Sequence, residues 1–461
     1  MSDIETVLST VDSNLDASIE RLFDLLRIES ISTDPAYAGE CEKAGQWLVD
    51  TLNDLGFDAS LHHTEGHPMV VAHHDGPDGA PHVLFYGHYD VQPVDPLDLW
   101  DTHPFQPDII EVNGAKRLRG RGTSDDKGQL MTFVEACRSW KEATGALPCK
   151  VTILFEGEEE SGSPSLLPFL AAHGEELKAD LALVCDTNMW DASTPAIATA
   201  LRGMASEEIV VHGPSRDLHS GYYGGAAQNP IHILSSILSA LHNDKGRVTL
   251  DGFYEGVAPV PDDIRAMWDE LGFSETEFLG DVGLKKTAGE VGYSALEHIW
   301  SRPTAEVNGV IGGYTGKGFK TVIPAIASAK VSFRLVGEQD PHKVIAAFHK
   351  HVETHLPDDC SVEYIPHGRS KATQLDYALP ALKQASTALT EEWGKPAALI
   401  AMGGSIPIVG NFKRELGMDS LLVGFGLAED NIHSPNEKYE LASYHKGTRS
   451  WVRILQALAD G

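Results

Sequence analysis

The sequence predicts an α/β protein, in which a mostly parallel sheet flanked by helices carries an inserted, smaller α+β domain. Short apolar runs without polar alternation, such as Val83 to Tyr86 and Val151 to Phe155, indicate strands buried on both faces. Helical patterns separate these runs, which is the arrangement of a parallel sheet. With 461 residues, the chain is also too long for one ordinary core.

The elements of the first domain follow one another along the chain. Ala17 to Ile28 and Glu42 to Leu55 each place apolar side chains on one helical face, and the second of these helices stops at Gly56. The other expected elements are strands at Met69 to Ala72, Val83 to Tyr86, Val151 to Phe155 and Leu181 to Cys185, and helices at Gly128 to Trp140 and Pro164 to Leu177.

The pattern changes after Arg202, where helices and alternating strands indicate a small α+β layer. We expect residues 1–202 to form the first part of the main domain, 203–371 the inserted domain, and 372–461 the second part of the main domain. The inserted elements are strands at Ser206 to His212, Ala327 to Val336 and Ser361 to Ile365, and helices at Asn229 to His242 and Pro341 to Leu356. The stretch from Lys245 to Gly313 receives no assignment.

Composition excludes several classes of partner. Acidic residues outnumber basic ones by 67 to 36, and the formal charge of −31 has the wrong sign for nucleic acid or an anionic membrane. The acidic residues are spread along the chain, which favours a solubilising surface over a specific acidic patch. Five widely spaced cysteines without a CxxC pair predict neither a disulfide framework nor a thiolate zinc site. No signal peptide or membrane-length apolar segment is present in the sequence, so we expect a cytoplasmic protein.

Polar residues follow the predicted strands where the sheet opens into loops. His88 and Asp90 come after the strand at Val83 to Tyr86, three glutamates at 158–160 follow Val151 to Phe155, and Asp186 follows Leu181 to Cys185. Two more loops bring Asp125 with Asp126, and His433 near the C-terminus. In an open parallel sheet such groups collect at the carboxyl ends of the strands.

Each of these residues has an ordinary structural explanation when taken alone. A single histidine such as His88 is more often structural than a ligand, Asp125 and Asp126 are placed to cap a helix, and Asp186 is placed to end a strand in a turn. The glutamates are compatible with a solvated loop. Together, however, two histidines and several carboxylates at one sheet edge form a ligand set suited to Zn²⁺, Mn²⁺ or Co²⁺.

Eight motifs also occur in a recognisable order: GHYDVQP, GRGTSDDKG, GEEESGS, VCDT, LHSGYYGG, KTVIPAIASAKVSFRLV, GGSIP and NIHSPNEKY. With them, the sequence resembles, over almost its whole length, the dinuclear metallopeptidase family of carnosinase, cytosolic non-specific dipeptidase, succinyl-diaminopimelate desuccinylase, acetylornithine deacetylase and glutamate carboxypeptidase. ESGS, HSGYYGG, KTVIP and GGSIP are most similar to the carnosinase and non-specific dipeptidase branch, which also carries an extension comparable to Lys245 to Gly313.

The resemblance implies two divalent metal ions, Zn or Mn with Co as an alternative, and a ligand for each position. His88 and Asp186 would hold one metal, Glu160 and His433 the other, and Asp125 would bridge them. Asp90 would accept a hydrogen bond from His88 and orient its ring.

The same resemblance selects Glu159 as the general base and leaves Glu158 without a task other than a solvent-facing or supporting one. Two neighbouring cations lower the pKa of a water held between them and polarise the scissile carbonyl. Glu159 would take the proton of that water and pass it to the leaving amine.

The inserted domain, by resemblance a ferredoxin-like lid and dimerisation domain, would supply substrate-binding groups. His219 would stabilise the oxyanion, often from the neighbouring subunit of a homodimer in this family. Arg334 would clamp the C-terminal carboxylate of the substrate, and Thr321 and Ser405 would add hydrogen bonds.

These expectations describe a cytoplasmic, homodimeric metallo-exopeptidase that hydrolyses dipeptides or short peptides with a free C-terminal carboxylate. An N-acyl-amino-acid amidohydrolase is the alternative, because its chemistry is the same amide hydrolysis with a different acyl group. A catalytically inactive metal-binding interaction protein is a third and less favoured interpretation, since every ligand position and the base are present. The sequence leaves open the native metal, the preferred dipeptide and the meaning of the acidic charge.

Overall fold

The computed structural model describes residues 3–403 and 407–461, and the chain divides into two compact units. The first unit comprises Met1–Thr199, Leu375–Ile400 and Ile408–Gly461, and the second comprises Ala200–Gln374 and Ala401–Pro407. The borders predicted after residues 202 and 371 lie close to those of the two units, at Thr199 and Gln374, but the described residues 401–403 also group with the second unit.

Over the described residues, nine strands form the larger sheet, in the order β1-β2-β6-β3-β7-β17-β8-β15 with β16 beside β8. Its centre is parallel, because β3 runs parallel to both β6 and β7, and β17 runs parallel to β7. The flanking pairs β1–β2, β2–β6, β17–β8 and β15–β8 are antiparallel. The α/β class is therefore confirmed, with a mixed sheet whose parallel part is central. The strands are β1 (Asp58–His62), β2 (Met69–His74), β3 (His82–His88), β6 (Lys150–Glu156), β7 (Leu181–Val184), β8 (Ala196–Leu201), β15 (Thr373–Gln374), β16 (Ala398–Met402) and β17 (Ser420–Leu422).

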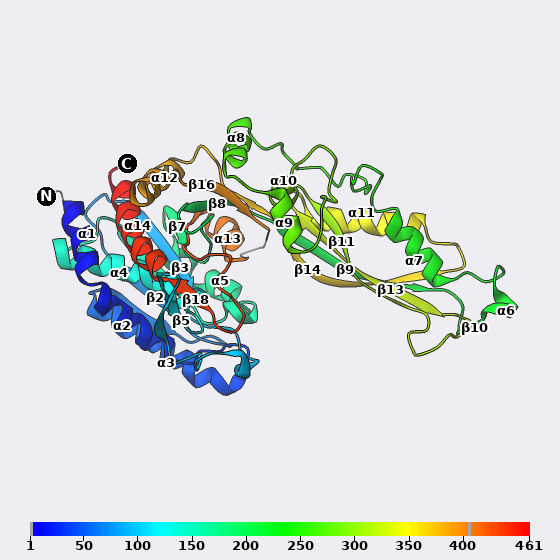
Figure 1. Ribbon diagram of the computed structural model, residues 1–461, viewed down its shortest axis with the longest axis horizontal. Helices are drawn as coiled ribbons and strands as arrows, with labels where there is room; N and C mark the ends of the chain where they lie inside the picture. The colour runs from blue at the N-terminus through cyan, green and yellow to red at the C-terminus, as the bar shows by residue number, and fades with distance from the viewer. Residues whose placement is uncertain (1–2, 404–406) are drawn as a thin grey trace. The chain divides into compact units, whose positions relative to one another are not determined.

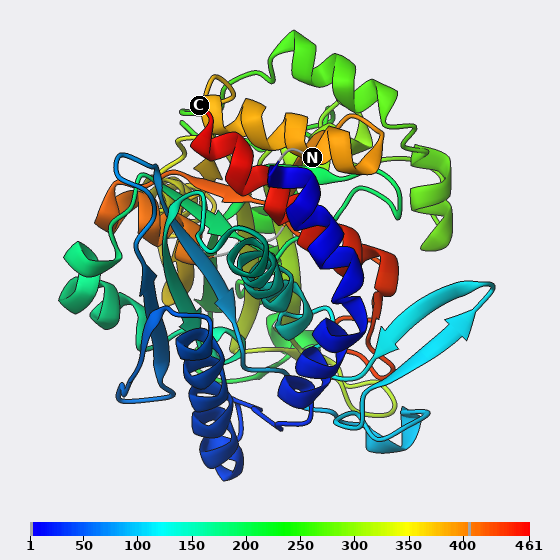
Figure 2. The same ribbon diagram turned by 90° about the vertical axis from the view of Figure 1, so that its left-hand side faces the viewer.

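Helices cover this sheet because each has a continuous apolar stripe to bury. Helices α1, α4 and α14 pack against one another, and α12 packs against α14 (Figure 2). At the sheet, the Phe85 ring stacks on Phe133 of α4 with centroids 3.8 Å apart, and Trp451 of α14 meets both rings edge-on. None of the described helices is long and apolar enough to cross a membrane. The helices are α1 (Asp3–Ser13), α2 (Leu15–Leu26), α3 (Ala38–Asp54), α4 (Lys127–Thr144), α5 (Leu166–Leu177), α12 (Pro380–Trp393), α13 (Pro407–Asn411) and α14 (Leu441–Ala459).

The second unit is built on an antiparallel sheet in the order β11-β13-β9-β14, with α7 and α11 packed against it (Figure 1). Along β9 and β13 buried and half-buried residues alternate, and the buried ones, such as Ile209 and Phe333, join the core under the two helices. The opposite face mixes polar residues such as Lys330 and Ser332 with exposed apolar ones such as Ile311 and Ile326. These elements are β9 (Gly203–His212), β11 (Thr304–Gly312), β13 (Ile326–Leu335), β14 (Ser361–Ser370), α7 (Pro230–Ser239) and α11 (Pro341–Thr354).

The stretch that the sequence left unassigned, Lys245 to Gly313, folds into α8 (Asp262–Glu270), α9 (Glu275–Asp281), α10 (Ala295–Trp300) and strand β11. Ser294 and Glu297 form a reciprocal capping box that starts α10. Trp268 and Trp300 meet edge-on with centroids 5.0 Å apart, which joins α8 to α10.

Two small sheets hold the remaining strands of the described residues. Strands β4 (Asp108–Val112) and β5 (Ala115–Arg119) form a hairpin to which β18 (Lys438–Glu440) adds a third strand. Strands β10 (Leu218–His219) and β12 (Val322–Ile323) form a two-stranded ribbon next to α6 (Ser220–Tyr223). The ribbon carries His219, and the hairpin with β18 joins the loops that carry Asp125 and His433.

Candidate metal centre

The predicted ligands meet at the carboxyl edge of the parallel strands, as the sheet rule requires. His88 is the last residue of β3, and β3 is parallel to β6 and β7 on either side. Glu160 lies in a short 3₁₀ turn, Glu159–Ser161, shortly after β6, and Asp186 follows β7. Asp125 precedes α4, and its peptide bond to Asp126 is cis. His433 lies in the loop between β17 and β18.

Asp125 stands between two groups of ligand atoms, which are His88 with Asp186 and Glu160 with His433. Its Oδ1 lies 3.1 Å from His88 Nε2, and its Oδ2 lies 2.9 Å from His433 Nε2. The ligand atoms within each group all lie within 4.8 Å of one another. One carboxylate with an oxygen directed at each group has the geometry of a bridging ligand.

The donor set fits two divalent cations. Imidazole nitrogens and carboxylate oxygens are the ligands that Zn²⁺ and Mn²⁺ take in proteins. Glu160 Oε2 accepts a hydrogen bond from Gln92 Nε2 at 2.8 Å and lies 3.3 Å from His433 Nε2. The other oxygen, Oε1, is buried and has no hydrogen-bond partner within the described part of the chain. A buried carboxylate oxygen without a partner is costly and is satisfied by a cation.

The electrostatics of the centre reflect its crowded carboxylates. Burial, together with Asp125 and Asp126, raises the pKa of Asp186 well above its ordinary value. Hydrogen bonds to Asp125 and Glu160 raise the pKa of His433 to about 10. Burial raises the pKa of Glu159, and the neighbouring Glu160 adds to this effect against the lowering by His88. The protein by itself therefore holds excess negative charge here that cations would relieve.

Asp90 does more than orient His88. Its Oδ1 lies 3.3 Å from His88 Nδ1, and its backbone carbonyl oxygen lies 3.2 Å from the same nitrogen. The same carboxylate also accepts hydrogen bonds from the backbone N–H groups of Glu159 and Glu160 at 3.2 and 3.0 Å, and from the Ser32 hydroxyl at 2.6 Å. Asp90 thus fixes the ring of one ligand and the turn that carries the two glutamates.

The three consecutive glutamates have different environments. Glu158 is 1% exposed and accepts hydrogen bonds from the backbone N–H groups of His67 and Ser165 at 2.6 and 2.9 Å. It faces away from solvent and ties the β1–β2 connection to the start of α5, a role that the sequence did not reveal. Glu159 is half-buried and interacts electrostatically with His88, Glu160 and Asp125, and Glu160 supplies one of the ligand atoms.

Sequence reasoning missed Glu437, whose carboxylate holds the backbone of the turn that carries Asp125. Glu437 is fully buried and accepts hydrogen bonds from the backbone N–H groups of Ser124 and Asp125 at 2.9 and 3.1 Å. It also pairs with Arg121 at 2.7 Å. The available signal was its position in NIHSPNEKY, four residues after His433, but sequence alone does not show which distant backbone a carboxylate caps.

The predicted substrate-binding residues that the structure describes lie in the second unit. His219 and Thr321 adjoin the β10–β12 ribbon, where the Ser220 N–H donates to the Thr321 carbonyl oxygen at 3.1 Å. The His219 side chain is exposed and accepts a hydrogen bond from the Gly221 N–H. Arg334 lies near the far end of β13, roughly 26 Å along that strand from Ile326 at about 3.3 Å per residue. The structure does not bring Arg334 to His219 and Thr321 within this unit, and Ser405 lies outside the described residues.

Comparisons with known proteins agree with this geometry. The chain is 30% identical to the Cys-Gly metallodipeptidase DUG1 of Candida albicans over 472 residues, which cover 97% of this chain and 96% of that protein. It is 27% identical to the Beta-Ala-His dipeptidase of Homo sapiens over 482 residues, which cover 99% of this chain and 93% of that protein.

Solved structures give the same result. The structure matches the dipeptidase Dug1p from Saccharomyces cerevisiae with a TM-score of 0.77 at 28% identity, covering all of both chains. It matches the metallo-carboxypeptidase Sso-CP2 from Sulfolobus solfataricus with a TM-score of 0.79 at 30% identity, covering 96% of this chain and 99% of the other. The model of Peptidase family M20/M25/M40 matches residues 84–457, a span that includes every residue of the metal centre. The chain belongs to peptidase family M20/M25/M40.

Proposed function

We propose that the protein is a dipeptidase that uses two divalent metal ions and cleaves dipeptides or short peptides with a free C-terminal carboxylate. The observation that carries this proposal is the pair of ligand groups that share Asp125, with the uncommitted carboxylate of Glu159 beside them. His88 and Asp186 would hold one ion, and Glu160 and His433 the other. Zn²⁺ and Mn²⁺ fit this donor set best, with Co²⁺ as an alternative.

The residues around the centre divide the work of amide hydrolysis. When bound, the cations supply Lewis-acid polarisation of the scissile carbonyl and lower the pKa of the attacking water. Glu159 takes the proton from that water and returns it to the nitrogen of the leaving amine. General acid–base transfer of this kind contributes about 10² to 10⁴ in rate. Asp90 helps to hold Glu159 in place, because its carboxylate accepts a hydrogen bond from the backbone N–H of Glu159.

The second unit would bind the substrate, with His219 at the oxyanion, Arg334 at the carboxylate, and Thr321 and Ser405 as further hydrogen-bond partners. Because Arg334 and the His219–Thr321 ribbon adjoin opposite ends of β13, this unit of one chain cannot present both to one dipeptide. This separation supports a homodimer, in which His219 and Thr321 of one copy serve the other. The proposed enzyme is a cytoplasmic homodimer.

The names of the relatives favour a dipeptidase over the deacylase alternative, because the DUG1 proteins and the Beta-Ala-His dipeptidases all act on dipeptides by name. The test is to strip the protein of metal, reload it with Zn²⁺, Mn²⁺ or Co²⁺, and measure hydrolysis of matched dipeptides and N-acyl-amino acids. Faster turnover of dipeptides supports the proposal. Hydrolysis confined to N-acyl-amino acids would replace it with the amidohydrolase, and metal binding without hydrolysis of either class would indicate the inactive protein.

Substitution of the glutamates tests the mechanism. Glu159→Gln should keep two bound metals while kcat falls about 10² to 10⁴-fold, since the amide takes up no proton. Glu158→Gln is the matched control, because it lowers the free energy of unfolding through a weakened backbone contact and leaves proton transfer intact. Near-normal turnover by Glu159→Gln would remove Glu159 as the base.

A further inference from the structure

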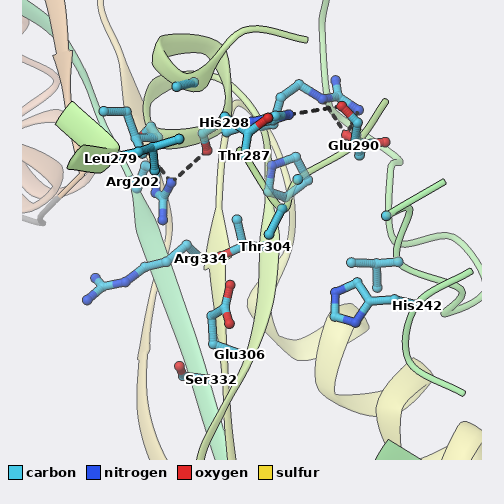
Figure 3. Close-up of a pocket in the computed structure, with 18 of the residues that line it drawn as sticks. Arg202, His242, Leu279, Thr287, Glu290, His298, Thr304, Glu306, Ser332 and Arg334 are labelled. Atoms are coloured by element: carbon cyan, nitrogen blue, oxygen red, sulfur yellow. Dashed lines mark hydrogen bonds and ion pairs between the residues drawn. The ribbon is translucent and has the colours of Figure 1, made fainter. Parts of the chain in front are cut away.

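The second unit contains a cavity of about 490 Å³ whose lining includes several charged side chains (Figure 3). It lies where the sheet face that carries Glu306 and Arg334 meets the extension, and α10 contributes to its lining. Its lining includes the charged side chains of Arg202 just before β9, Arg334 of β13 and Glu306 of β11.

Arg202 is only 9% exposed, which is unusual for an arginine without a carboxylate partner. Its Nη1 donates to the carbonyl oxygens of His298 and Ile299 at 3.1 and 2.9 Å. Its Nε is buried and has no hydrogen-bond partner in the described part of the chain. Burial and the nearby Arg334 lower the pKa of Arg202 to about 10. Two guanidinium groups in one wall give this part of the cavity a positive charge that favours an anion.

Glu306 lies on the same face of the sheet as Arg334, one side-chain position away. Thr304 is opposite Arg334 in the β11–β13 register, and Glu306 is opposite Ser332. No ion pair involves Glu306 or Arg334 within the described residues, although their charges are opposite. By contrast, Glu290 in the same wall is paired with Arg302 at 2.6 Å. The cavity therefore offers both a cationic and an anionic group that are free to meet a ligand.

We propose that this cavity binds a zwitterionic residue, the one that carries the free carboxylate of the substrate, and selects it for a basic side chain. Arg334 takes the carboxylate, Arg202 adds a positive charge to the same wall, and Glu306 takes the cationic end of a lysine-like or arginine-like side chain. This inference rests on the proposed dipeptidase function and adds the class of residue at the carboxyl end. Glu306 is its specificity-determining residue, since a neutral or acidic side chain would leave that carboxylate unpaired or repelled.

The test measures kcat/KM on the metal-loaded enzyme with alanyl dipeptides that end in lysine, arginine, leucine or glutamate. Wild-type enzyme should prefer the basic residues over glutamate by about tenfold or more, as for other close charge pairs. Glu306→Gln should reduce this preference, and Glu306→Lys should reverse it towards glutamate. Glu306 is exposed and unpaired, so neither variant should disturb folding.

Glu208→Gln is the matched control. Glu208 stands in β9 opposite Lys330, on the same face of the sheet as Glu306 but outside the cavity lining, and its substitution should leave the preference unchanged. Equal kcat/KM for the lysine and glutamate dipeptides in wild type, or an unchanged preference in Glu306→Lys, would overturn the inference.

A binding experiment separates failure of this inference from failure of the proposed function. If no dipeptide is hydrolysed, the dipeptidase proposal falls, and calorimetry with free L-arginine and L-glutamate then probes the cavity directly. Binding of arginine that Glu306→Lys weakens about tenfold or more, while Glu208→Gln does not, supports the site. Absence of arginine binding, or binding that is the same in both variants, refutes it.

Discussion

The deepest test of the metal centre is to change Glu437, whose carboxylate holds the backbone of the proposed ligand Asp125. Its Oε1 accepts from the N–H groups of Ser124 and Asp125, and its Oε2 accepts from the Gly122 N–H at 3.0 Å and from Arg121 Nη1 at 2.7 Å. Glu437 therefore fixes the turn that presents Asp125 to both histidines.

Glu437→Gln keeps the shape of the side chain but replaces one oxygen with an NH₂ group. Each oxygen of Glu437 accepts from two donors, so the NH₂ group loses two hydrogen bonds in either orientation. The buried Arg121 also loses its negatively charged partner. Breaking a buried ion pair in this way costs about 3–5 kcal/mol of unfolding free energy. Because Asp125 loses its fixed position, we also expect metal affinity to fall about 10- to 100-fold, as for other groups that orient ligands.

Chemical denaturation measures the stability, and competition with a chelator measures the metal affinity. Glu135→Gln is the matched control, since Glu135 is also buried and is held by Arg21 through two hydrogen bonds of 2.8 and 2.6 Å, but on the helix α4 and not in the ligand turn. Both variants should lose stability, and only Glu437→Gln should lose metal affinity. Equal metal affinities in wild type and Glu437→Gln would refute the positioning role.

Two further predictions concern pH and substrate binding. Burial raises the pKa of Glu156 from 4.5 to about 7, so the folded state holds this proton more tightly than the unfolded state does. The resulting contribution to the free energy of unfolding is fully present below pH 4.5 and is lost as the pH rises through 7. Glu156→Gln keeps an acceptor for the Tyr86 hydroxyl but carries no charge at high pH. It should therefore raise the free energy of unfolding by roughly 3 kcal/mol at pH 8 and by little near pH 4.5. Denaturation curves that give the same difference between variant and wild type at both pH values would contradict this prediction. Arg334→Met should raise KM for a dipeptide about 10- to 100-fold with little change in kcat, because the variant loses one charged hydrogen-bonded pair with the bound substrate. The control is the KM of the same dipeptide amidated at its C-terminus, which Arg334→Met should not change. An unchanged KM for the free acid would contradict the role of Arg334 in binding the carboxylate.

Much of the fold was accessible from the sequence because it depends on local patterns. The apolar runs at Val83 to Tyr86 and Val151 to Phe155 became β3 and β6, and the two are parallel as expected. The antiparallel edges were not foreseen, since strand direction depends on how the connections run. The connection from β1 to β2 spans only His62 to Met69, which is too short for a helical crossover and so makes that pair antiparallel.

By itself, the sequence determined which residues could be metal ligands, because short motifs place them directly after strands and the parallel sheet brings strand ends together. Together with the family resemblance, it selected Glu159 among three adjacent glutamates as the expected base. The tertiary structure alone decided that Glu158 caps backbone N–H groups, that Asp90 also holds the glutamate turn, and that Glu437 supports Asp125. These roles depend on contacts between residues up to 312 positions apart, and local patterns of polarity and spacing carry no information about which distant backbone a buried carboxylate will meet.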